Sequence, residues 1–365
     1  IQTMEQKTWQ DFEQNKRPWP SPFLQQAWIG LMFFEKKSPE NDNTADDLQN
    51  LNHTVWFLKF PLDEQAQLSL LARDDFLRRL IETLGNYLQQ QKDNSSTDKV
   101  MYSLENAMKD NPYGFQPKQE TLANFHAIVH QQLGLKSSSY YHPTQHYLAA
   151  VANSGNNSTN NNDWQQLGIQ GFADLSARLD EKYQGKNNQK LVLDSIAQLP
   201  LPVLRVLGLC LENHKTSKQL LEAVLDMLIN QIEHNHHTTD LASIGTAAIR
   251  MTAQSNDTKT QLKLLQIILS SAIKTDIEVL ASISGRCWIL LTHDDILLPY
   301  LEALALTDQD QHPGAFNAVL TDLMFIPGIR ESILKSFRCS ERSEILTQSI
   351  AGFLNQQVFK ENITP

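Results

Sequence analysis

Residues 218–233 read KQLLEAVLDMLINQIE, and this stretch indicates most clearly which fold the chain adopts. Apolar residues recur in it every three or four positions, at Leu220, Leu221, Val224, Leu225, Leu228 and Ile232. This spacing places them on one face of a helix, so it predicts a helix over 217–233. Similar patterns follow one another from Lys118 to Pro365, where we find no strand pattern and no catalytic motif. The sequence therefore predicts a mainly α-helical protein.

The helical part of the chain divides into many short amphipathic segments. We predict helices near 118–133, 140–152, 163–180, 187–198, 201–212, 217–233, 239–254, 258–272, 275–284, 287–306, 313–324, 328–337 and 341–358. Neighbouring segments form pairs of about 35–40 residues joined by short turns, which is typical of an irregular, HEAT-like helical array. The Asn- and Ser-rich residues 153–162 predict a loop.

The first third of the chain has a different pattern. Residues 27–34 and 54–60 are short and rich in aromatic and β-branched side chains, which predicts a β-hairpin with a long exposed loop over 37–52. A long helix is predicted from Asp63 to Gln90, and a shorter one from Thr97 to Lys109. The turn-forming residues that follow indicate a border between a small α+β domain (1–115) and an all-helical repeat-like domain (116–365).

Both faces of the predicted strands are apolar: Val55 and Phe57 alternate with Trp56 and Leu58. The long helix can cover only one of these faces, and two strands alone are marginal in water. We therefore expect further cover from an upstream strand, the second domain or another subunit. The chain opens on Ile1 rather than Met, so we expect further residues upstream.

Composition narrows the function classes. The net charge is −10 and the basic runs are only two residues long, so we expect no nucleic-acid partner. We find no signal peptide and no apolar run of the ~20 residues that a membrane span needs. The three cysteines are far apart and odd in number, which favours free thiols in a reducing, cytoplasmic compartment.

Several sequence blocks resemble one known family. The blocks are Gln26–Phe33, Trp56–Gln65 (WFLKFPLDEQ), Ala72–Leu77, Asn111–Phe115, Leu167–Leu175 and Arg178–Asp180. They are similar to a bacterial family known only as domain of unknown function 3549, and WFLKFPLDEQ is the most specific of them. The resemblance implies a soluble bacterial protein and implies no activity and no catalytic residues.

Two histidine pairs are the candidate metal ligands: His126 with His130, and His142 with His146. Residues four apart share a helix face, so each pair could chelate a divalent cation. No further ligand is evident beside either pair, and Pro143 interrupts the second. We predict histidines of the helix surface or core edge, and we expect no bound cofactor and no transition metal.

The candidate residues for contact with a partner are Arg73, Arg78, Trp28 and Trp56. Asp74 with Arg78, and Asp75 with Arg79, are spaced to form ion pairs worth about 0.2–0.5 kcal/mol each, which would support the long helix. Alternatively, Arg73 or Arg78 pairs with acidic residues of a partner.

The sequence favours a non-enzymatic scaffold that binds a protein partner on the surface of its helical array, with homo-oligomers as a further option. The alternative is an enzyme or small-molecule-binding protein with a site between the two domains, including a metal-dependent hydrolase. His293-Asp294-Asp295 contains the His-Asp dipeptide of all-helical phosphohydrolases. We predict instead that Asp294 or Asp295 caps the following helix.

Overall fold

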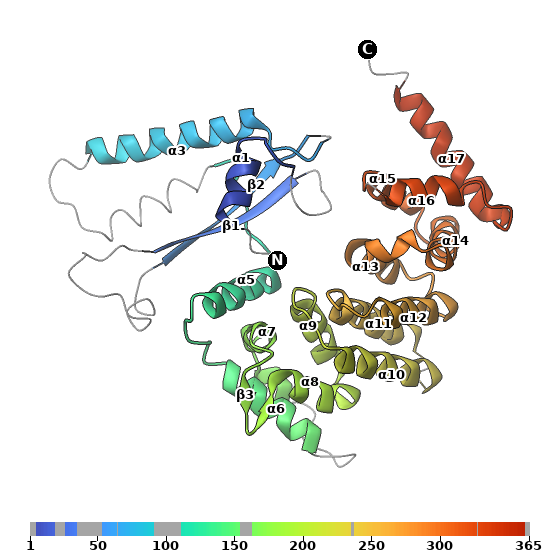
Figure 1. Cartoon of the computed structure of the whole chain (residues 1–365), viewed down its shortest axis with the longest axis horizontal. Helices are drawn as coiled ribbons and strands as arrows, with labels where there is room; N and C mark the ends of the chain where they lie inside the picture. The colour runs from blue at the N-terminus through green and yellow to red at the C-terminus, as the bar shows by residue number, and fades with distance from the viewer. Residues whose placement is uncertain are drawn as a thin grey trace. The chain divides into compact units, whose positions relative to one another are not determined.

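The computed structural model describes residues 5–18, 26–34, 53–63, 65–90, 111–153, 163–234, 237–326 and 328–361 (Figure 1). The chain forms two compact units, Ile1–Ser137 and Ser138–Pro365. It is mainly α-helical with two small antiparallel hairpins, which confirms the predicted fold class. Its HEAT-like character and the domain border at 115/116 stay predictions. The predicted loop over 37–52 and helix over 97–109 lie outside the described residues.

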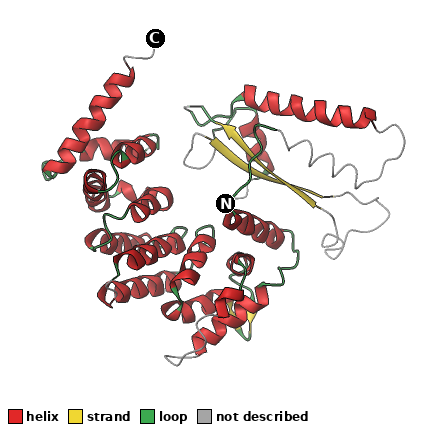
Figure 2. Ribbon diagram, turned by 180° about the vertical axis from the view of Figure 1, so that it is seen from behind, coloured by secondary structure: helices red, strands yellow, loops and turns green. Residues whose placement is uncertain are grey.

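The first unit is organised around strands β1 (Gln26–Phe34) and β2 (His53–Pro61), which pair antiparallel with Gly30 opposite Phe57 (Figure 2). Both strands match the predicted ranges to within one residue at each end. Successive side chains of a strand point to opposite faces of the sheet. Trp56, Leu58 and Phe60 therefore share one face of β2, and Phe57 lies on the other.

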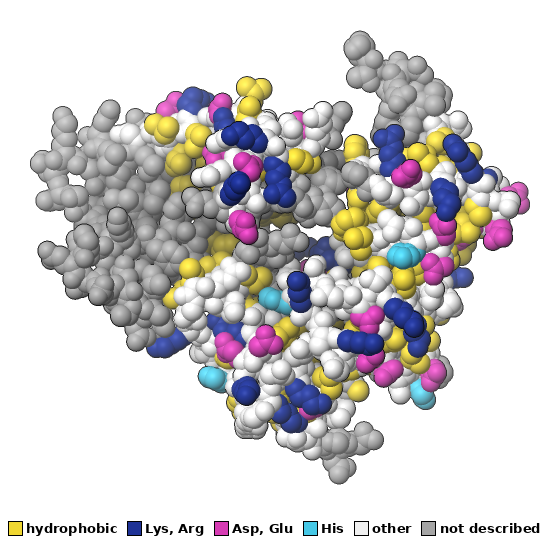
Figure 3. All heavy atoms as spheres, viewed as in Figure 1, with side chains coloured by type: hydrophobic (Ala, Val, Ile, Leu, Met, Phe, Trp, Pro, Cys, Tyr) yellow, Lys and Arg dark blue, Asp and Glu magenta, His cyan; other side chains and the backbone are white. Residues whose placement is uncertain are grey.

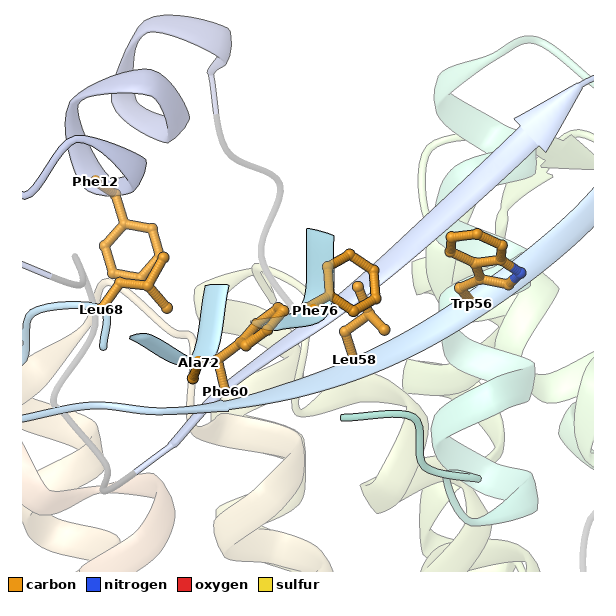
Figure 4. Close-up of a cluster of buried hydrophobic side chains, with 7 residues drawn as sticks. All are labelled: Phe12, Trp56, Leu58, Phe60, Leu68, Ala72 and Phe76. Carbon is orange, nitrogen blue, oxygen red and sulfur yellow. The ribbon is translucent and has the colours of Figure 1, made fainter. Parts of the chain in front are cut away.

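The first face of the sheet carries the core of this unit (Figure 4). Trp56, Leu58 and Phe60 are buried there with Phe12 of α1 (Gln6–Glu13), Leu68, and Ala72 and Phe76 of α3 (Leu70–Gln90). The rings of Phe60 and Phe76 meet edge to face, with centroids 5.5 Å apart. This arrangement stabilises aromatic pairs beyond the area that they bury.

The second face of the sheet is covered by a later part of the same chain. The backbone N–H of Lys59 donates to the carbonyl of Tyr113 (2.8 Å), and that of Phe115 donates to the carbonyl of Phe57 (3.0 Å). These bonds place a short third segment along β2. The ring of Phe57 packs against Phe125 of α5 (Gln119–Gln132), with centroids 5.0 Å apart. We expected something beyond the two strands to complete this sheet. Within the described residues the sheet has two strands, an isolated bridge joins Leu58 of β2 to Gly114, and Phe125 of the same chain packs on the second face.

Helix α3 begins seven residues later than predicted, at Leu70 instead of Asp63. The carboxylate of Asp63 accepts hydrogen bonds from the backbone N–H groups of Gln65 (2.9 Å) and Gln67 (2.8 Å). Asp side chains that bind the backbone in this way favour turns over helices. The hydroxyl of Ser69 then accepts from the N–H of Ala72 (3.4 Å), as at a helix N-cap.

The second unit is a stack of helices in two layers (Figure 1). The first layer contains α7 (Ile169–Ala177), α9 (Leu201–Leu211), α11 (Thr238–Thr252), α13 (Ile277–Arg286) and α15 (Ala315–Met324). The second contains α8 (Asn188–Ser195), α10 (Lys218–His234), α12 (Thr258–Ser270), α14 (Asp294–Asp310) and α16 (Ile329–Ser336). In each layer, every helix packs on the next helix of the same layer. From α9 onward, the first-layer helices start every 37 to 39 residues.

Further elements join or extend the two layers. They are α6 (Tyr141–Asn153), η1 (Asp163–Gln166), β3 (Lys182–Tyr183), β4 (Lys186–Asn187), η2 (Ile196–Gln198), η3 (Trp288–Thr292) and α17 (Glu344–Glu361). Three predicted helices, over 163–180, 187–198 and 287–306, are each divided into an α-helix and a 3₁₀ turn. The β3–β4 hairpin corrects the expectation that this part of the chain has no strand. Its turn needs the positive φ of Gly185 (82°).

Candidate functional site

Four aromatic rings form a cluster on the second face of the sheet. Trp28 of β1 packs on Phe115 with ring centroids 4.9 Å apart, and Phe57 lies between Phe115 (6.1 Å) and Phe125 (5.0 Å). The side chain of Trp28 is 58% exposed at the border of this cluster. A Cβ added at Gly30 would overlap the ring of Phe125 and would lie 2.9 Å from its Cδ2 atom. The absence of a side chain at Gly30 therefore allows α5 to lie close to β1.

The two tryptophans predicted to contact a partner occupy different environments. Trp56 is only 4% exposed and belongs to the core of the first unit (Figure 4). Trp28 is the member of this pair that reaches the surface.

The two arginines predicted to contact a partner lie on α3 and also differ. Nη1 of Arg73 donates to the carbonyl of Glu13 (2.9 Å), so Arg73 links α3 to α1. Arg78 is exposed and binds Asp75 (2.6 Å) and Glu82 (3.1 Å) of its own helix.

The ion pairs of α3 only partly follow the prediction. The pair of Asp75 with Arg79 is present at 2.7 Å. Asp74 instead binds Arg73, its neighbour in the chain, at 2.7 Å. Hydrogen bonds from Arg79 and Arg78 hold the pKa of Asp75 below its usual value.

The two histidine pairs lie on two different helices. His126 and His130 are half-buried on α5, with ring centroids 6.0 Å apart. His142 and His146 are exposed on α6, where Nδ1 of His142 lies 2.9 Å from Oε1 of Gln145. Within the described ranges, no group of three or more His, Cys, Asp or Glu side chains is placed to hold a metal ion. The predicted absence of a metal stays a prediction.

A buried polar network connects to His142 through Gln145. The sequence alone did not predict this network. Asp174 and Arg178 of the segment around α7 form a buried ion pair at 3.0 Å, and Asp174 also accepts from the N–H of Ser138 (2.9 Å). Asn188, at the start of α8, donates to the Tyr141 hydroxyl (2.8 Å) and to the Arg178 carbonyl (2.7 Å). The available signal was an Asp and an Arg four residues apart within an apolar segment.

This network joins α6, α7 and α8 through partners that satisfy one another. Gln145 donates to Asn188 (2.8 Å), and the Tyr141 hydroxyl donates to Glu181 (2.8 Å). Burial raises the pKa of Tyr141, so its hydroxyl keeps its proton and acts as a donor. The arrangement fixes the start of the helical stack. The buried polar side chains of this network therefore have a structural role.

A second polar link crosses three first-layer helices farther along the stack. Glu212, just after α9, receives two hydrogen bonds from Arg286 of α13 (2.7 and 3.1 Å) and lies 3.4 Å from Arg250 of α11. Bidentate contacts of this kind fix geometry as well as charge. Glu212 therefore holds one side of α9, α11 and α13 in register.

The His-Asp dipeptide lies at the start of α14, where His293 is the N-cap residue. The prediction that Asp294 or Asp295 is the cap is therefore wrong, because both lie in the first helical turn. Asp294 binds Lys335 (2.6 Å), and Asp295 accepts from Gln266 (2.6 Å). Acidic residues in a first turn interact favourably with the helix dipole.

Comparison with known proteins yields one family. The family model described as "Protein of unknown function (DUF3549)" matches residues 1–354. No curated protein and no solved structure matches the chain. Among the described helices, none combines the length and the apolar character that a membrane crossing needs.

Proposed function

The chain belongs to the DUF3549 family, and we propose that it is a non-enzymatic protein that binds a protein partner on the first layer of its helical stack. The proposal includes a HEAT-like array, which the 37- to 39-residue spacing of first-layer helices supports. A cytoplasmic location agrees with its three free thiols.

The observation that carries this proposal is the outer face of α11. From Leu241 to Thr252, every residue is buried except Ser243, Thr246 and Arg250. Their spacing of three and four residues places them on one side of the helix. α11 is therefore enclosed on its other sides, and one narrow strip of half-buried residues lies on its outer side.

The neighbouring helices continue this strip. On α9, the exposed Pro202 and Arg205 share a side with Glu212, and on α13 the exposed Ala281 and Gly285 precede Arg286. The contacts of Glu212 with Arg250 and Arg286 indicate that the three outward sides face the same way. Three helices thus offer one continuous surface of small and polar side chains. Stacked helix pairs commonly bind partners on extended surfaces of this kind.

Affinity capture from the native host tests the proposal. Tagged wild-type protein should retain a partner that mass spectrometry identifies. Ala281→Arg places a long charged side chain on this first-layer surface and should reduce its recovery at least about tenfold, since a misplaced charge costs several kcal/mol at an interface.

The matched control is Asp226→Arg, which changes an exposed residue of α10 in the second layer. This variant should retain the partner. Equal recovery with both variants, or loss only with Asp226→Arg, would show that the first-layer surface is not the binding surface. Circular dichroism should confirm that both variants keep the helical content of the wild type.

A further inference from the structure

Helix α3 presents a charged and apolar strip on the side that faces away from the sheet. Leu71 is 85% exposed and Ile81 is 68% exposed. Between them, the side chains of Asp74 and Arg78 are 61% and 58% exposed. Figure 3 shows acidic, basic and apolar side chains interleaved on α3. The buried Ala72 and Phe76 lie on the opposite side of the helix, against the sheet.

The spacing of these four residues is that of a helix-pairing seam. Positions 71, 74, 78 and 81 are separated by three, four and three residues, as are the inward positions of a coiled coil. Their order is apolar, acidic, basic, apolar. In an antiparallel pair centred at the level of position 76 along the helix, Leu71 meets Ile81 of the other helix, and Asp74 meets Arg78. The strip is therefore complementary to itself.

We propose that α3 pairs antiparallel with α3 of a second copy of this chain. A two-fold axis that crosses the exposed strip at the level of position 76 makes two Leu71–Ile81 contacts and two Asp74–Arg78 ion pairs, one at each symmetry-related position. This complementarity of charge favours a second copy over an unrelated partner, because the acidic half of one strip lies opposite the basic half of the other.

The contacts that these residues make in a single chain do not oppose pairing strongly. Asp74 binds Arg73, and Arg78 binds Asp75 and Glu82, all on the exposed surface of α3. Exposed ion pairs stabilise by only about 0–1 kcal/mol, so exchanging or sharing them costs little. One helix per copy buries less than the roughly 1,200–2,000 Å² of a standard interface. The dimer should therefore be weak and dependent on concentration.

Sedimentation of the full chain over a range of concentrations tests this proposal. The wild type should shift from monomer to dimer as its concentration rises. Arg78→Asp places Asp74 opposite an aspartate, and Asp74→Arg places Arg78 opposite an arginine. Each substitution should weaken the dimer at least about tenfold, because like charges face each other at both positions. Arg79→Glu, a charge reversal outside the seam, should leave the dimer intact.

A mixture of the two seam variants gives the decisive result. In the heterodimer of Arg78→Asp with Asp74→Arg, both positions again hold opposite charges, so dimers should reappear only on mixing. Reappearance also excludes misfolding as the cause of the single-variant losses. The proposal is wrong if the wild type stays monomeric at all concentrations, if neither substitution weakens the dimer, or if mixing the two variants restores no dimer.

Discussion

A single histidine should make the second unit sensitive to mild acid. His214 lies in the turn after α9, where its N–H donates to the carbonyl of Leu211 (2.9 Å). Nε2 of its ring is buried and finds no hydrogen-bond partner among the described residues. Burial lowers the pKa of His214 from 6.5 to about 4, because the charged ring would lose its hydration.

The sign and size of the effect follow from this shift. Between pH 6.5 and 4, the unfolded chain binds a proton at this position and the folded chain does not, so the free energy of unfolding falls as the pH falls. The loss relative to neutral pH should reach about 2 kcal/mol at pH 5 and about 3 kcal/mol at pH 4. Above about pH 6.5 the contribution is fully present.

The assay compares the wild type with His214→Phe, which keeps a ring and removes the titrating group. Urea unfolding followed by circular dichroism at a series of pH values gives the free energy of unfolding of each protein. The contributions of the other titrating groups cancel in the difference between the two free energies. The wild type should lose about 2 kcal/mol more than the variant between pH 7 and 5. Parallel curves for the two proteins, or an NMR titration that places the His214 pKa near 6.5, would refute the reasoning.

Three further substitutions should destabilise the protein by amounts that thermal or urea unfolding can measure. Trp56→Ala should cost about 3–5 kcal/mol in the first unit, and an unchanged transition would contradict the burial of this ring. Gly30→Ala should cost about 1–3 kcal/mol by forcing the ring of Phe125 aside, and Gly30→Ala combined with Phe125→Leu should recover part of that loss. Asp174→Asn should cost about 3–5 kcal/mol in the second unit because buried Arg178 loses its main counter-charge, whereas a loss below 1 kcal/mol would mean that the pair is effectively solvated.

The periodic parts of the fold could be predicted from the sequence, because one helix or strand carries its own pattern. The predicted range 217–233 matches α10 (Lys218–His234) to within one residue, and both long strands were located with similar accuracy. The start of α3 differs from the prediction because the carboxylate of Asp63 closes a turn, and an apolar pattern does not report such a bond. The hairpin around Gly185 was missed because two-residue strands have no period to detect.

The candidate sites depend on residues that are distant in the sequence, and no local pattern reports such contacts. Glu212 meets Arg286 across 74 positions. Asn188 meets Tyr141 across 47 positions. The cover of the second sheet face was expected on physical grounds, but only the structure identifies it as the ring of Phe125. Trp28 and Trp56 look alike in sequence, and pairing geometry decides which of them is exposed.

The layered stack also bears on how this family can vary. Since each first-layer helix packs on helices that lie close to it along the chain, a change in one helix pair needs compensation only in the adjoining pairs. Helix pairs can then diverge almost independently, which accounts for a regular spacing without a shared residue consensus. A pair could also be duplicated or deleted at the end of the stack with the remaining interfaces preserved. Positions such as Glu212, which join three successive helices, should resist such drift most strongly.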